Sequence, residues 1–91
     1  MTLTYPAVFQ PHKDGSFDGY FPDLEGGARF HGSDIDDAIN HAIEALHDWI
    51  DVQIEDNEEL PLLSDEGDIT LKDGEFIRSV SAIVHLGVGY Y

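Results

Sequence analysis

Apolar and polar side chains alternate along the first part of the chain, as they do in a half-buried strand. Residues 3–12 follow this pattern, and one face of the predicted strand comprises Leu3, Tyr5, Ala7 and Phe9. Proline has no N–H group to donate to a ladder. Pro6 and Pro11 therefore predict that part of this strand lies at a sheet edge or at a bulge.

Turn-forming residues end this strand and shape the next segment. Asp14-Gly15 is a strong hairpin signal, because the turn requires positive φ, and it predicts a second strand over residues 16–21. Gly19, inside that strand, suggests a bulge or a close backbone approach. Pro22 and Gly26-Gly27 then predict a tight change of direction.

The clearest apolar pattern follows a short third strand predicted over residues 27–31. Ser33-Asp34-Ile35-Asp36 resembles a capping box, and it predicts the start of a helix that ends near Asn57, before Pro61. Apolar residues recur at spacings of three and four, which is typical of an amphipathic helix. They are Ile35, Ala38, Ile39, Ala42, Ile43, Leu46, Trp49, Ile50 and Ile54.

The last part of the chain returns to strand-like alternation. Residues 68–71 predict a short strand, Lys72-Asp73-Gly74 predicts a turn, and residues 75–86 predict the last long strand. The predicted order is β-β-β-α-β. We therefore expect a single α+β domain over residues 1–91, an antiparallel sheet with one long helix packed on one face.

The composition limits the chemistry that this domain can perform and the cellular location in which we expect it. The chain has no cysteine, which excludes disulfides, thiolate catalysis and zinc–sulfur sites. It has neither a secretory signal pattern at its start nor an apolar run of about 18 residues that could cross a membrane. We expect a soluble, cytoplasmic protein.

The net charge points to the chemistry of a partner. Nineteen acidic residues face four basic ones, which gives a formal charge of −15, and no Lys or Arg occurs between Phe30 and Leu71. Such a chain is poorly suited to bind nucleic acid or an anionic membrane directly, because phosphate contacts need Lys and Arg. A basic protein is the complementary partner, and simple solubility is the alternative explanation.

The predicted helix violates local charge rules. Glu44/Asp48 and Asp51/Glu55 are like charges at i,i+4, each costing about 0.2–0.5 kcal/mol. Acids at the end of the helix oppose its dipole. Such violations often mark functional surfaces, although a well-solvated face is the alternative. The residues predicted to bind a partner are Asp23, Glu25, Asp48, Asp51, Glu55, Glu58 and Glu59.

The sequence offers little support for catalysis. A metal-dependent nuclease needs several converging carboxylates, yet residues 2–10 contain no Asp or Glu. The alternative of a residual nuclease rests on Asp18, Asp23 and a helix acid such as Glu44. His41 and His47 are six residues apart and lack the i,i+4 spacing of a helical metal pair. We predict no catalytic residue, no metal and no cofactor.

Several short motifs occur in an order that resembles the HicB-type antitoxins. They are Tyr5-Pro6-Ala7-Val8-Phe9, Asp14-Gly15, Phe21-Pro22-Asp23-Leu24-Glu25-Gly26 and Gly32-Ser33-Asp34-Ile35-Asp36-Asp37-Ala38. Each motif is short, but their order and spacing together are fairly specific, and the resemblance covers about residues 3–86.

This resemblance implies a fold and a role. The implied fold is a partly degraded ribonuclease-H-like domain, of a β-β-β-α-β type that is also similar to double-stranded-RNA-binding domains. The implied role is inhibition of a HicA-type toxin, a small basic mRNA ribonuclease, rather than RNA cleavage by the antitoxin itself. Many family members continue into a DNA-binding domain, which we expect this chain to lack because it stops at Tyr91. Edge strands and prolines also suggest a homo-oligomer, with or without an inhibitory role.

Overall fold

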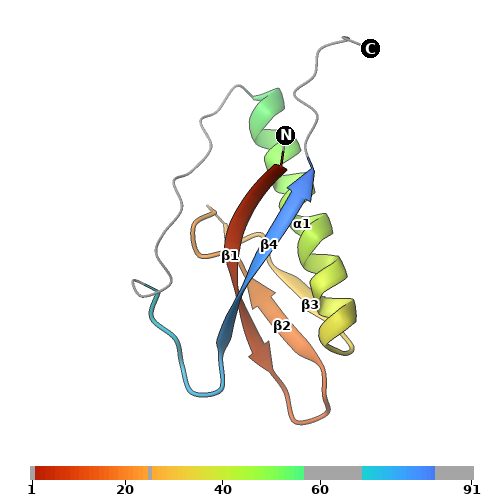
Figure 1. The fold of residues 1–91 in the computed structure, drawn as a ribbon, viewed down its shortest axis with the longest axis vertical. Helices are drawn as coiled ribbons and strands as arrows, with labels where there is room; N and C mark the ends of the chain where they lie inside the picture. Colours follow the sequence, from red (N-terminus) through yellow and green to blue (C-terminus); the bar gives the residue numbers. More distant parts are fainter. Residues whose placement is uncertain (1, 25, 57–68, 84–91) are drawn as a thin grey trace.

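The computed structural model describes residues 2–24, 26–56 and 69–83. It contains a four-stranded antiparallel sheet of order β3-β2-β1-β4 with one long helix packed on one face (Figure 1), which confirms the predicted fold class. In chain order the elements are β1 Thr2–Pro11, β2 Phe17–Tyr20, β3 Phe30–Gly32, α1 Ile35–Glu55 and β4 Phe76–Ile83.

The two prolines of β1 lie where the strand has a partner on one side only. β1 pairs with β4 from Thr2 to Phe9 and with β2 from Val8 to Pro11. Pro6 therefore lies beside β4 alone, and Pro11 lies beside β2 alone. The prediction that the prolines mark partial edges is confirmed, because neither interrupts a ladder on both sides.

Two element predictions need correction. The third strand begins at Phe30 and not at residue 27, because residues 27–29 do not pair with β2. Residues 69–71 form no strand, so the short strand predicted over residues 68–71 is wrong for the part that is described. Residues 84–86, predicted to belong to the last strand, lie outside the described residues.

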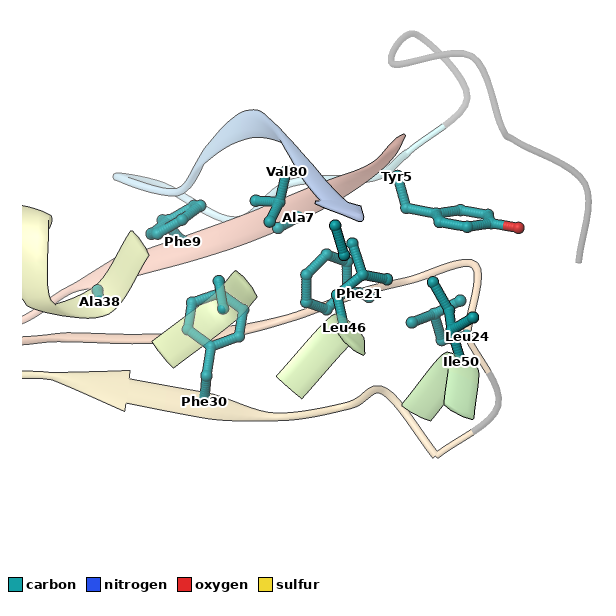
Figure 2. Close-up of a cluster of buried hydrophobic side chains, with 12 residues drawn as sticks. Tyr5, Ala7, Phe9, Phe21, Leu24, Phe30, Ala38, Leu46, Ile50 and Val80 are labelled. Atoms are coloured by element: carbon teal, nitrogen blue, oxygen red, sulfur yellow. The ribbon is translucent and has the colours of Figure 1, made fainter. Parts of the chain in front are cut away.

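The core lies between the sheet and α1. β1 contributes Tyr5, Ala7 and Phe9, and the helix contributes Ala38, Ala42, Leu46 and Ile50, all of them buried (Figure 2). Alanines at three of these positions allow the helix backbone to approach the sheet. Ile43 fits the apolar period of the helix but lies at the margin of the core, since 38% of its surface is exposed.

Gly19 allows an aromatic cluster to form across three strands. It pairs with Phe9 on one side and Phe30 on the other, and these two rings meet edge to face with centroids 5.2 Å apart. A Cβ atom on Gly19 would lie 2.1 Å from Cζ of Phe30. The close approach suggested by this glycine is therefore present.

Asp34, and not Ser33, caps the start of α1. Asp34 has extended backbone geometry (φ −149°), and its carboxylate accepts a hydrogen bond of 2.8 Å from the N–H of Asp37. The Asp37 carboxylate in turn accepts hydrogen bonds from the backbone N–H and the hydroxyl of Ser33, and the backbone bond is the main cause that lowers the pKa of Asp37. The N-cap is thus one residue later than predicted, and the capping box is incomplete, because the Asp37 carboxylate accepts from the N–H of Ser33 and not from that of the cap residue Asp34.

Candidate partner-binding surface

The outward side of α1 carries a row of acids, which is interrupted between Asp37 and Glu44. Because Ala38, Ala42, Leu46 and Ile50 face the sheet, residues half a turn away face outward. We call this row the acidic stripe. It comprises Asp37, Glu44, Asp48, Asp51 and Glu55.

No Lys or Arg on α1 neutralises the acidic stripe. The nearest cationic candidates are histidines: Nδ1 of His47 lies 3.2 Å from Asp51, and Nδ1 of His41 lies 3.8 Å from Asp37. The two arginines lie elsewhere, Arg29 over the ring of Tyr20 and Arg78 over that of Phe76. The helix thus presents negative potential along most of its length.

Two exposed aliphatic side chains flank the acidic stripe. Val52 is 52% exposed and Ile43 is 38% exposed, although both belong to an otherwise well-packed helix. Protein interfaces combine apolar contacts with a polar rim. An acidic row with apolar residues at its sides therefore resembles a docking surface more than a purely solvated face.

The turn between β2 and β3 is held by its own backbone and anchored in the core. The N–H of Leu24 donates to the carbonyl of Phe21, the N–H of Gly27 donates to that of Leu24, and the N–H of Phe21 donates to the carbonyl of Gly27. Gly26 and Gly27 have φ of 85° and 82°, so the glycines serve the turn as predicted. Leu24 is buried in the same cluster as Ile50 (Figure 2).

Asp23, in this turn, lies near the start of β1. Burial is the main cause that raises the pKa of the Tyr5 hydroxyl, and the charge of Asp23 adds to the rise. Since Leu24 packs with Ile50, the turn lies at the same end of the core as the C-terminal half of α1. Of the predicted partner-binding residues, Asp23, Asp48, Asp51 and Glu55 are thus placed by the structure, whereas Glu25, Glu58 and Glu59 lie outside the described residues.

The carboxylates of the nuclease alternative do not converge. Asp18 pairs with Gln10 and His31 on the sheet face opposite α1, whereas Glu44 lies on the outward side of that helix. Within residues 2–24, 26–56 and 69–83, no group of three or more His, Asp or Glu side chains is arranged to hold a metal ion. In this described part there is also no helix that is long and apolar enough to cross a membrane.

A polar network on the sheet face opposite α1 was not predicted from the sequence. The Asp18 carboxylate is 2.9 Å from Nε2 of His12 and 2.5 Å from Nδ1 of His31. It links the β1–β2 turn to β3. Little in the sequence indicates this network. The three residues come together only through strand pairing, and no local sequence pattern links them.

The Asp18 network predicts a defined acid sensitivity. Hydrogen bonds from His31 and then His12 hold the pKa of the Asp18 carboxyl below its usual value of 3.8. The network therefore contributes stability above pH 3.8, and this contribution is lost as the pH falls from there through the folded-state pKa. In Asp18→Asn, we expect a smaller difference in unfolding free energy between pH 7 and about pH 3 than in the unmodified protein.

Urea unfolding at the two pH values measures this difference. Asp73→Asn removes the same charge from an exposed turn and serves as the control. Equal acid sensitivity of Asp18→Asn and the unmodified chain would show that the network contributes nothing to folding.

A family model identifies the chain. The model of the HicB-like antitoxins of bacterial toxin–antitoxin systems matches residues 5–90. The chain belongs to the HicB-like antitoxin family. This confirms the resemblance carried by its short motifs. No match was found among curated protein sequences.

Solved structures share the fold of this HicB-like protein. A toxin–antitoxin complex from Streptococcus pneumoniae contains a chain with 27% identity and a TM-score of 0.76, with 91% of this chain and 70% of that chain covered. A complex of HicA3 and HicB3 matches with 27% identity and a TM-score of 0.67, covering 90% and 100%. The N-terminal domain of the Burkholderia pseudomallei antitoxin HicB, at 23% identity, shows the same fold, with a TM-score of 0.74 and coverage of 90% and 100%.

Proposed function

We propose that this HicB-like protein is the antitoxin of a type II toxin–antitoxin pair, and that it binds and inhibits a small basic ribonuclease of the HicA type. The family match and the similarity to a chain of the HicA3–HicB3 complex support this role. The observation that carries the proposal for this chain is the acidic stripe, which is complementary to a basic, RNA-binding toxin surface.

The proposed mechanism is steric and electrostatic. The acidic stripe attracts the toxin, and the rigid helix holds the carboxylates where RNA phosphates would otherwise bind. The flanking residues Val52 and Ile43 add apolar contact once the surfaces meet. Inhibition in this scheme needs no chemical step by the antitoxin, and its net charge of −15 disfavours direct binding to RNA or DNA.

Co-expression with any small basic protein that is encoded beside this gene tests the proposal. We expect restored growth of cells that produce the toxin, and a purified complex whose association slows as salt concentration rises. A neighbouring basic protein that is toxic but neither bound nor inhibited by this chain would refute the proposed function.

A pair of matched variants then tests the position of the interface. Asp48→Asn/Glu55→Gln removes two negative charges from the acidic stripe, and Asp36→Asn/Asp73→Asn removes two exposed charges from outside it. We expect the first variant to bind the toxin about tenfold more weakly, mainly through a slower association rate, and the second to change affinity about twofold or less. Equal effects in surface plasmon resonance at low salt would place the interface elsewhere.

A further inference from the structure

The two arginines of this chain form no ion pair, although acids greatly outnumber bases. In the part of the chain that the structure describes, every ion pair involves a histidine, and neither Arg29 nor Arg78 bonds to a carboxylate. Each guanidinium lies over an aromatic ring instead, Arg29 at 5.7 Å from the ring centre of Tyr20 and Arg78 at 5.3 Å from that of Phe76. Both arginines are exposed, so two cationic groups remain free to meet a binding protein.

The contact with a ring prepares Arg78 for recognition of an anion. A guanidinium that lies over a ring uses its flat face for that contact and keeps N–H donors at its edge for hydrogen bonds. Phe76 is itself only partly exposed and packs against the core, so it is a fixed support. A side chain held in this way loses less conformational entropy when it binds, which raises its affinity for a suitable acceptor.

The two arginines lie on opposite faces of the sheet. Arg78 pairs with Ala7, which is buried on the helix side of β1 (Figure 2), and residues directly opposite each other in a strand pair share a face. Tyr20, which supports Arg29, pairs instead with Val8, the next residue along β1, and successive residues of a strand face opposite ways. Arg78 therefore lies on the same side of the sheet as α1, and Arg29 does not.

The flank of α1 that faces β4 connects Arg78 with the acidic stripe. Nδ1 of His41 contacts the backbone carbonyl oxygen of His31, so that flank of the helix faces β3, at one edge of the sheet. Ile43 comes two residues later, about 200° around the helix, and therefore lies on the flank that faces β1 and β4. It is 38% exposed. A protein that binds the acidic stripe and extends over Ile43 reaches β4 and the guanidinium of Arg78.

We propose that Arg78 binds a side-chain carboxylate of the toxin, at the margin of the interface formed by the acidic stripe. This inference rests on the proposed function. The planar guanidinium matches a carboxylate with two parallel hydrogen bonds, and arginine is enriched among residues that dominate binding energy. A row of acids attracts a basic surface in many positions, whereas one base beside that row selects the position in which its counterpart is acidic. Arg78 thus determines how the toxin is oriented on α1.

Removal of Arg78 should have an effect opposite to the one that net charge predicts. Arg78→Ala makes the chain more negative than −15, so long-range attraction alone would leave binding of a basic toxin unchanged or make it tighter. We expect instead about tenfold weaker binding in surface plasmon resonance, through faster dissociation. Arg29→Ala makes the same charge change on the opposite face and should leave the dissociation rate unchanged. Equal dissociation rates for the two variants would overturn the inference.

An exchange of charges tests the proposed contact directly. Arg78→Glu is expected to weaken binding more than Arg78→Ala does. Replacing one Asp or Glu of the toxin with Lys should restore affinity for Arg78→Glu while it weakens binding of the unmodified chain. If none of the toxin's acids behaves in this way, Arg78 binds no side-chain carboxylate and the inference is wrong. A toxin that binds equally well whatever residue stands at position 78 contradicts this inference alone, whereas a toxin that never binds contradicts the proposed function as well.

Discussion

Gly32→Ala is expected to destabilise this protein by about 3 kcal/mol or more, which is a large part of the roughly 5–15 kcal/mol that holds a typical domain folded. A Cβ atom on Gly32 would lie 2.1 Å from the backbone N of Ala38 and 2.7 Å from the carbonyl C of Asp37. These are backbone atoms of the first turn of α1, so no side-chain rotation relieves the clash. Either β3 or the start of the helix must move.

A substitution at a second glycine, Gly15, provides the control, because it introduces an unfavourable backbone conformation without a steric clash. Gly15 has φ of 91° with open space around it, so Gly15→Ala is strained by its backbone conformation alone, at a cost of about 1 kcal/mol. Urea unfolding followed by circular dichroism compares the two variants. If Gly32→Ala is no less stable than Gly15→Ala, then β3 does not abut the helix as described. The contact matters for function because it sets the angle at which α1 presents the acidic stripe.

Local sequence signals were sufficient to predict most of the fold. The 3.6-residue period of α1, the alternation of β1 and the Asp14-Gly15 turn each depend on neighbours in the chain, and all are present in the structure. The acidic stripe follows from the same period, because the core positions of a helix define its exposed side. The prolines of β1 were also informative, since each removes one specific donor.

Features that depend on distant segments could not be predicted in the same way. Val8 alternates onto the sheet face opposite the helix, yet it is fully buried, and no local pattern indicates this. Ile43 fits the helix period but lies at the margin of the core and is partly exposed. The Asp18–His31 contact arises only when β2 pairs with β3. Asp23 comes near Tyr5 of β1 only because the turn that contains it is anchored in the core by its neighbour Leu24.

Phe9→Ala is the other substitution for which we expect a large effect, about 3–5 kcal/mol of lost stability. Phe9 is fully buried, and its ring lies between two others, edge to face with Phe30 at 5.2 Å and stacked on Phe76 at 5.4 Å. Removing it leaves a cavity beneath α1 that the surrounding strands cannot close without losing their register. Phe9→Leu retains most of the volume and should cost clearly less.

Phe17→Ala provides the matched control for the loss of Phe9. Phe17 is partly exposed and contacts only the margin of the same aromatic cluster, with its ring 6.0 Å from Phe76. We expect a loss of about 1–2 kcal/mol, because less apolar surface returns to water. Thermal and urea unfolding measure all three variants, and equal losses for Phe9→Ala and Phe17→Ala would contradict the position of Phe9 at the centre of the core. Since Phe9 lies in the core on the sheet side of α1, and the acidic stripe lies on the outward side, any folded Phe9→Ala protein should still bind a basic partner, with apparent affinity reduced only by the fraction that is unfolded.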